Sequence, residues 1–403
     1  MSLTRALDAG VSLPASVPAT LEGARARINS VDLLRGAVMV LMALDHTRDF
    51  FAASGMNPRD VTDPALFLTR WITHYCAPAF IFLAGMSAYL YGARGRGTGE
   101  VSRFLLTRGF WLIAIEFTLV RFGWGFSLTS THFVAQVIWV IGASMIVLAG
   151  LVHLPRWAIA TFGLVMIAGH NLLDGIRAED LGSAGWVWNF LHQPALLRGQ
   201  FASVRTLYSI VPWVGVMAAG YALGPVSQLD ETARRRLLMR LGIAVTAGFV
   251  LLRASNLYGD PAGWSLQGSW WATVLSFVNC EKYPPSLLYL MMTLGPALIL
   301  LSLLEHARGR LADWITVFGR VPFLYYVAHI FLIHLLAIVF AQVVYGDGTW
   351  LIGRFPPQKP AGYALPLPGV YAAWIVVVVA LYPLCSWFAA LKQRRCEWWW
   401  SYL

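Results

Sequence analysis

The chain of 403 residues has few charged side chains and few cysteines, and it lacks the common short motifs of soluble enzymes. Only 12% of its residues are charged and 58% are hydrophobic, which excludes an ordinary water-soluble globule. The four cysteines show no metal or redox spacing, so no metal is expected, and Cys76 and Cys280 are expected to be free thiols. The absence of a Gly-rich phosphate loop, HExxH and GxSxG leaves ATP-driven pumping and soluble-type hydrolysis without support.

The net charge of +10 is spread along the chain and is not gathered into one patch. Basic residues lie between apolar stretches, so no nucleic-acid partner is expected. Most of them fall on alternate loops, and the positive-inside rule then places both termini in the cytoplasm. Residues 1–26 contain prolines and no apolar core, which indicates a mobile cytoplasmic tail and no signal peptide. Residues 27–403 are interpreted as one integral-membrane domain.

Apolar stretches long enough to cross a hydrocarbon core of about 30 Å recur along the chain. They predict an all-α polytopic membrane protein with about ten transmembrane helices. Segment 264–279 is either an eleventh, short span or, like 186–193 and 356–368, a re-entrant or interfacial piece over an outer cavity. The predicted spans are residues 33–51, 74–91, 108–122, 133–151, 157–173, 207–223, 238–253, 286–304, 322–344 and 370–391.

The first predicted span ends in a dense group of ionisable residues, Asp45, His46, Arg48 and Asp49. At 1.5 Å per residue from Leu33, His46 lies about 20 Å into the membrane, where an unpaired ionisable group costs several kcal/mol. Helical spacing of three residues pairs His46 with Asp49 and Asp45 with Arg48. The group is either a polar helix end or the wall of a water-filled cavity, and its charge density favours the cavity.

The ninth predicted span carries two histidines. Tyr326 and His329 are three residues apart and share a helix face, whereas His329 and His334 are five apart and do not form an i, i+4 metal pair. Counting along the helix predicts His334 near the level of His46 and His329 nearer the cytoplasm. Both histidines either line a passage or form packing hydrogen bonds between helices.

Other polar residues give weaker signals. Glu116 lies in the middle of the third predicted span and is a functional candidate because a lone carboxylate there is costly. His170 and Asp174 are interpreted as a solvated helix cap at the outer end of the fifth span. The remaining histidines are expected in ordinary loops: His132, His153, His192 and His306.

Three segments resemble the heparan-α-glucosaminide N-acetyltransferase catalytic-domain family and its bacterial relatives. They are residues 27–36 (RINSVDLLRG), 77–85 (APAFIFLAG) and 326–329 (YVAH). The first segment is also similar to the wider class of transmembrane acyltransferases, whose first helix carries an Arg, ten further residues and a His, as Arg35 and His46 do here. The resemblance implies a cytoplasmic acyl-CoA donor, passage of the acyl group through the membrane core and an acceptor sugar on the far side.

One departure from that family concerns the active-site histidine, which the family carries in its first luminal loop. Residues 47–73 of this chain contain no histidine. The function then falls to His46, or to His74 at the end of the loop, or is absent.

The resulting hypothesis is a multi-pass acyltransferase of the inner membrane that moves an acyl group, with acetyl favoured, from acyl-CoA to a hydroxyl or amine of an extracytoplasmic glycan. The sequence does not decide whether the protein forms a homo-oligomer. The alternative is a proton-coupled transporter or flippase that uses the same buried groups. The expected site residues are His46 as base with Asp45 or Asp49, His329 and Tyr326 on the acyl route, Arg35, Arg94, Arg96 and Arg320 on the CoA phosphates, and Arg48, His74, Glu281 and Lys282 on the acceptor side.

Overall fold

A computed structural model describes residues 19–53, 56–353 and 359–395, with side chains from residue 30 onward. It is 73% helix and 4% strand. Six of its helices are long and apolar enough to cross a membrane, or up to seven if one bent pair counts as a span. The chain is therefore an integral, multi-pass membrane protein, and the expected total of about ten spans stays a prediction.

Fifteen α-helices are described. Several begin where a polar side chain caps the first turn, as Asp230 does at α10 and Ser286 at α12. The α-helices are α1 Ala19–Phe51, α2 Pro64–Thr73, α3 Cys76–Gly92, α4 Thr98–Ile115, α5 Arg121–Gly125, α6 Val137–Leu151, α7 Arg156–Gly169, α8 Gly185–Leu191, α9 Ile210–Leu223, α10 Glu231–Ser255, α11 Trp270–Val278, α12 Leu287–Leu304, α13 Arg310–Arg320, α14 Pro322–Tyr345 and α15 Leu367–Arg394. A π-helical turn, η1 Glu116–Val120, joins α4 to α5, and four 3₁₀ turns complete the helical part: η2 His170–Leu173, η3 Ala178–Ala184, η4 Gly224–Gln228 and η5 Thr349–Leu351.

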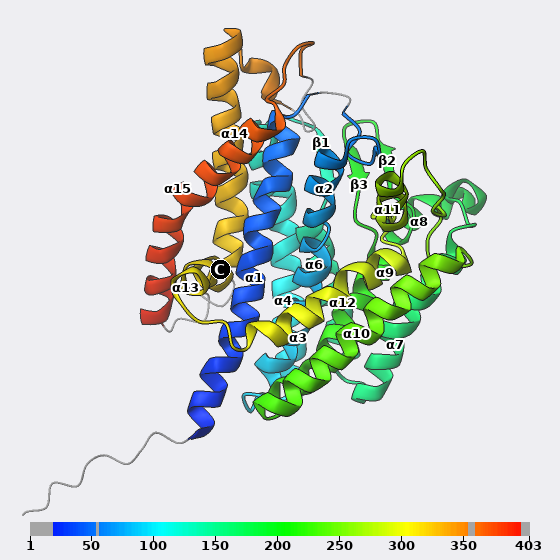
Figure 1. Ribbon diagram of the computed structural model, residues 1–403, viewed down its shortest axis with the longest axis vertical. Helices are drawn as coiled ribbons and strands as arrows, with labels where there is room; N and C mark the ends of the chain where they lie inside the picture. Colours follow the sequence, from blue (N-terminus) through cyan, green and yellow to red (C-terminus); the bar gives the residue numbers. More distant parts are fainter. Residues whose placement is uncertain (1–18, 54–55, 354–358, 396–403) are drawn as a thin grey trace, which may run out of the picture.

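Helix α1 occupies the middle of the bundle (Figure 1). It contacts α2, α3, α12, α13, α14 and α15, which come from all parts of the sequence. Its apolar side chains, among them Met39, Ala43 and Leu44, are buried in the core. A polar side chain on α1 is therefore presented to several helices at once.

Paired glycines let neighbouring helices approach closely. A Cβ on Gly36 of α1 would lie 2.1 Å from the Ile315 carbonyl oxygen of α13, and one on Gly319 of α13 would lie 1.8 Å from the Asp32 carbonyl oxygen of α1. Small residues at such crossings are typical of membrane helices, which associate by close backbone packing. Four further helix pairs share this device: Gly85 with Gly220, Gly109 with Gly142, Gly163 with Gly215, and Gly242 with Gly295.

A small sheet departs from the all-α expectation. It comprises β1 His132–Ala135, β2 Ala195–Arg198 and β3 Ser203–Thr206 in the order β1-β3-β2, with β1 parallel and β2 antiparallel to β3. It lies at the same end of the molecule as α2, α8 and α11, which is called the loop-rich end below (Figure 1). The predicted span 133–151 therefore starts as a strand, and its helix α6 begins only at Val137.

The longer connecting segments pack at the loop-rich end as short helices. Helix α11 has nine residues and is about 13 Å long, too short to cross the membrane, so the alternative of an eleventh span is wrong. Segment Ala178–Leu191, which contains η3 and α8, is bent by 110° from Arg156–Leu173. Part of the expected segment 356–368 lies outside the described residues. Cys76 and Cys280 are buried free thiols, as predicted.

Candidate functional site

The ionisable group at the end of α1 forms the pairs that helical spacing predicts. His46 Nδ1 lies 3.7 Å from Asp49 Oδ2, and Arg48 Nη2 lies 2.7 Å from Asp45 Oδ1 and 3.1 Å from Asp49 Oδ1. Arg48 thus bridges the two carboxylates. The His46 side chain is only 13% exposed, and its Nδ1 has no hydrogen bond among the described residues.

A cavity of about 610 Å³ opens beside this group. Six segments distant in sequence supply its walls, which combine charged groups with aromatic rings. The lining residues are Met42, Asp45, His46, Asp49, Thr73, Cys76, Ala77, Phe80, Gln136, Val137, Leu207, Tyr208, Lys282, Tyr283 and Tyr326.

Helix α14 brings a second histidine against the first. The rings of His46 and His329 are 5.2 Å apart, and Trp124 contacts His46 edge-on at 4.8 Å. His329 Nδ1 bonds the Tyr325 carbonyl oxygen at 2.9 Å, and its Nε2 has no partner in the described part of the chain. The Tyr326 hydroxyl is likewise buried without a hydrogen-bond partner there and lines the cavity.

The predicted depths of the two α14 histidines are wrong. His329 lies at the level of His46, whereas His334 lies farther out and stacks on Phe50 at 4.7 Å and on Phe126 at 4.0 Å. His334 bonds two backbone carbonyl oxygens, Gly123 at 2.8 Å and Leu351 at 3.1 Å. Its role is therefore to pack α14 against α5 and η5.

The segment before α12 brings Lys282 to the same cavity, whereas the neighbouring Glu281 is not a lining residue. Lys282 Nζ lies 4.0 Å from Asp45 Oδ2, and Glu281 Oε2 lies 2.8 Å from Arg59 Nη1. His74, at the junction of α2 and α3, is buried beside Tyr289, and neither of its ring nitrogens has a hydrogen-bond partner among the described residues. Of these three residues, Lys282 is the one with a described contact to Asp45, and the acceptor-side role of all three stays a prediction.

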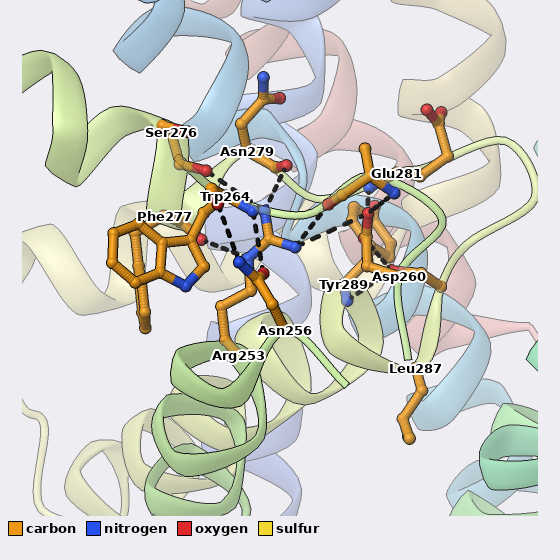
Figure 2. Close-up of polar contacts among 12 residues, drawn as sticks. Arg253, Asn256, Asp260, Trp264, Ser276, Phe277, Asn279, Glu281, Leu287 and Tyr289 are labelled. Atoms are coloured by element: carbon orange, nitrogen blue, oxygen red, sulfur yellow. Dashed lines mark hydrogen bonds and ion pairs between the residues drawn. The ribbon is translucent and has the colours of Figure 1, made fainter. Parts of the chain in front are cut away.

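A buried arginine that the sequence analysis missed holds this segment in place. Arg253, at the end of α10, donates hydrogen bonds to the carbonyl oxygens of Ala262 at 2.7 Å and Phe277 at 2.9 Å, and to those of Ser276 and Asn279 at 3.2 Å each (Figure 2). Asp260 lies 3.8 Å from its guanidinium. The signal in the sequence was an arginine in the last turn of a long apolar helix.

A second charged group lies near the middle of α1, about three turns before His46. Arg35 bonds Asp32 at 2.8 Å, Ser87 Oγ at 3.1 Å and the Gly319 carbonyl oxygen at 3.2 Å. Arg320, Lys392 and Arg108 join this group electrostatically, of which the last two were not predicted. Arg94 and Arg96 are exposed near the end of α3, where Arg96 stacks over Tyr91.

Glu116 is buried in the π-helical turn η1, a distortion frequent at functional sites. Its Oε2 accepts a hydrogen bond of 2.8 Å from Trp139 N in the first turn of α6. It also lines a second cavity of about 370 Å³ with Arg121, His132 and Gln136. Gln136 lines both cavities, so the cavity that Glu116 lines adjoins the cavity that His46 lines.

The expected solvated cap at His170 and Asp174 is wrong for the histidine. His170 and His192 are both buried, because η3 and α8 fold back over the end of α7. His192 Nε2 lies 2.8 Å from the His170 carbonyl oxygen and 3.5 Å from Asp174 Oδ1. Throughout the described residues, no group of three His, Cys, Asp or Glu side chains is arranged to hold a metal ion.

Comparison with known proteins gives one family. The model for "Heparan-alpha-glucosaminide N-acetyltransferase, catalytic" matches residues 27–253, which is more than half of the chain. No curated protein matches the sequence. The match contains His46 and Asp49 and ends at Arg253, before Lys282 and His329.

Proposed function

Because the chain belongs to the heparan-alpha-glucosaminide N-acetyltransferase catalytic family, which implies a transmembrane acetyltransferase, we propose that it moves an acetyl group from cytoplasmic acetyl-CoA to an extracytoplasmic acceptor. The acceptor is an amine or hydroxyl of a glycan, and the protein resides in the inner membrane. The observation that carries this proposal is His46, a half-buried histidine that contacts a second histidine and lines the cavity.

His46 acts as the general base in this proposal. A proton on Nδ1 directed at Asp49 leaves the lone pair on Nε2, which removes a proton from the acceptor nitrogen or oxygen. The acceptor then forms a bond to the acetyl carbonyl carbon while the bond from that carbon to the CoA sulfur breaks. The proton passes from His46 to the departing thiolate, so that charge and atoms balance.

Tyr326 stabilises the reacting carbonyl, whereas His329 is a hydrogen-bond acceptor beside His46. The bond from His329 Nδ1 to the Tyr325 carbonyl oxygen requires the proton on Nδ1 in the neutral ring, which leaves Nε2 as an acceptor beside His46. The Tyr326 hydroxyl is the donor available for the developing oxyanion, and removal of such a donor typically costs about 10²–10³-fold in rate.

The group around Arg35 is proposed to hold the CoA phosphates. It lies 11 residues before His46 on α1, or about 16 Å along the helix. Arginine suits phosphate because its planar donors bind two oxygens at once, and Arg320 and Lys392 add positive charge at the same place. No contact described in the structure links Arg94 or Arg96 to Arg35, Arg320 or Lys392, so the proposal does not include them.

The test uses protein reconstituted in vesicles, with labelled acetyl-CoA on one side and an amino sugar on the other. Wild type is expected to acetylate the sugar, and His46→Ala to lose about 10²–10⁴ of the rate while retaining thermal stabilisation by CoA. Unchanged transfer by His46→Ala would remove the assignment. Proton-coupled uptake of the sugar without CoA binding would instead support a transporter.

A further inference from the structure

The buried carboxylate of Glu116 has no part in the acetyl transfer described above. Its side chain is 1% exposed, and among the described residues it forms no ion pair with a cation. Its Oε2 accepts a hydrogen bond from Trp139 N at 2.8 Å, which caps the first turn of α6. A carboxylate has about four lone-pair sites, so this cap leaves much of its acceptor capacity unused. A lone carboxylate within a membrane bundle is costly and is retained where it has a function.

Glu116 lies where two cavities adjoin. It lines the cavity of about 370 Å³, and it is within electrostatic range of Tyr326, whose hydroxyl group belongs to the cavity that His46 lines. Gln136 lines both cavities. The π-helical turn η1, which carries Glu116, packs against both α14 and β1. The smaller cavity therefore connects the His46 cavity with the region around β1.

The far wall of the smaller cavity reaches the protein surface at the loop-rich end. His132, the first residue of β1, lines this cavity and is exposed (Figure 1). Arg121 of α5 donates hydrogen bonds to the carbonyl oxygens of Ser130 and, at 3.4 Å, of His132, and so holds this wall in place. The titratable groups on the elements packed against η1 near this cavity are thus Arg121 of α5, His132 of β1 and Tyr326 of α14.

An amine acceptor carries one proton too many for the transfer. At neutral pH most of it is the ammonium ion R–NH₃⁺, because amino groups of this kind have a pKa of about 8. The amide product keeps one of the three hydrogens on nitrogen, and the departing CoA thiolate receives a second one by way of His46. The third must leave as a proton before the nitrogen has a lone pair with which to attack.

His46 cannot accept both of these protons. A neutral imidazole has one free lone pair, and the attack on the acetyl group needs it. Asp45 and Asp49 are engaged by Arg48, at 2.7 and 3.1 Å. Glu116 has no such cation among the described residues, so it is the carboxylate near the cavity that is available for the extra proton.

We propose that Glu116 accepts the proton that an ammonium acceptor loses beside Tyr326 and releases it to water at the exposed His132 end of the smaller cavity. This inference rests on the proposed function and adds a proton outlet to it. An N–H bond of the acceptor breaks and leaves its electron pair on nitrogen, and water beside Gln136 carries the proton to the carboxylate. The carboxylic acid then loses it to water at the surface, so that charge and atoms balance. A hydroxyl acceptor carries no extra proton and does not need the outlet.

The experiment compares Glu116→Gln with wild type in the vesicle assay, with glucosamine as acceptor, at pH 6 and pH 9. Glutamine retains an oxygen for Trp139 N but cannot take up a proton. The neutral fraction of an amine with a pKa of about 8 rises from about 1% to about 90% between these values. A variant confined to the neutral form should therefore show a kcat/KM about 10²-fold below wild type at pH 6 and within about twofold of it at pH 9. His46 titrates in both proteins, so the ratio isolates Glu116.

An equal loss at both pH values would assign Glu116 to the cap of α6 alone and would overturn the proposal. Gln136→Leu provides a second test if Glu116→Gln does not fold, because it blocks the place where the cavities adjoin and leaves the carboxylate intact. It should show the same pH-dependent loss. A ratio to wild type that does not change with pH in this variant would overturn the route.

Glu179→Gln is the matched control. It removes one carboxylate from η3, where the side chain is exposed and lines neither cavity. It should match wild type at both pH values, and the same pH-dependent loss would show that the effect is only surface charge and would overturn the assignment to Glu116.

Failure of this inference is distinguishable from failure of the proposed function. Acetyl transfer by wild type, with a ratio between Glu116→Gln and wild type that is the same at both pH values, would overturn the outlet alone. If wild type transfers no acetyl group at either pH, the proposed function is overturned and the outlet with it.

Discussion

Two arginines, the buried Arg253 and the half-buried Arg48, differ in how their hydrogen-bond donors are used. Arg253 directs its guanidinium at four backbone carbonyl oxygens and lies beside Asp260, which has its own donors from Glu281 and Ser286. Arg48 bridges two carboxylates, but its Nη1 is buried without a partner among the described residues. We call the group around Arg253 and Asp260 the closed cluster, because the donors and acceptors of these two side chains have partners. We call the group of Asp45, Arg48 and Asp49 the open cluster, because one donor of Arg48 has none in the described part of the chain.

The difference separates structure from function. A buried polar network with every partner in place rigidifies the fold, whereas a partly satisfied one is costly and needs another reason to persist. Several of the described groups that are buried without a hydrogen-bond partner lie at one cavity: His46 and Tyr326 line it, and His329 contacts His46. The closed Arg253 cluster lies behind them and holds the segment that carries Lys282.

The largest expected effect comes from breaking the closed cluster. Arg253→Gln removes the ion pair with Asp260 and strands several carbonyl groups, so it should lower the free energy of unfolding by about 3–5 kcal/mol. Denaturant titration in detergent measures this loss. Arg59→Gln, which breaks a half-exposed pair with Glu281, is the control and should cost at most about 1 kcal/mol.

Breaking the open cluster should have a smaller effect on stability. Arg48→Gln leaves Asp45 and Asp49 facing each other without their shared cation, which should cost about 1–3 kcal/mol. The same titration applies, together with acetyl transfer measured per folded molecule. A loss as large as that of Arg253→Gln would contradict the distinction between the two clusters.

Asp49→Asn tests the orientation of His46. The amide retains the shape of the carboxylate but not its charge, so the rate should fall by about tenfold while the melting temperature changes little. The separation of kcat from KM is the decisive measurement, because loss of the orienting group should lower kcat and leave the KM for the acceptor unchanged. An unchanged kcat would assign Asp49 to Arg48 alone.

The smallest expected effect is a gain. Lys282→Met replaces an ammonium group 4.0 Å from Asp45 by an apolar chain of similar length, and Arg48 still neutralises Asp45, so the melting temperature should stay the same or rise slightly. Differential scanning in detergent measures this change. A clear destabilisation would place Lys282 with the closed cluster.

Local spacing in the sequence predicted the pairs on α1, because residues three apart on a helix lie on one face whatever surrounds them. The pairing of Asp45 with Lys282 depends on how α1 and the segment before α12 meet, which no local pattern encodes. Apolar composition alone also failed to separate β1 from the helix that follows it, since a short apolar run such as residues 133–135 suits either structure.

The error in the depth of His329 has a geometric cause. Counting residues from the edge of each predicted span assumes that all helices begin at one level and run parallel. Helix α14 extends beyond α1 at the loop-rich end, and its last turn is exposed at Val343 and Val344 (Figure 1). Its residues therefore lie at different levels from those the count assigned, and His329 meets His46.

The place of Arg253 in the chain bears on modularity. The family match stops at this residue, yet every carbonyl group that its side chain binds belongs to residues 262–279. A fragment cut at the border of the match would retain the cation and lose its partners, together with α12, α13 and α14 that enclose α1. The segment recognisable by sequence is thus smaller than the unit that folds, and swaps between relatives should be joined elsewhere.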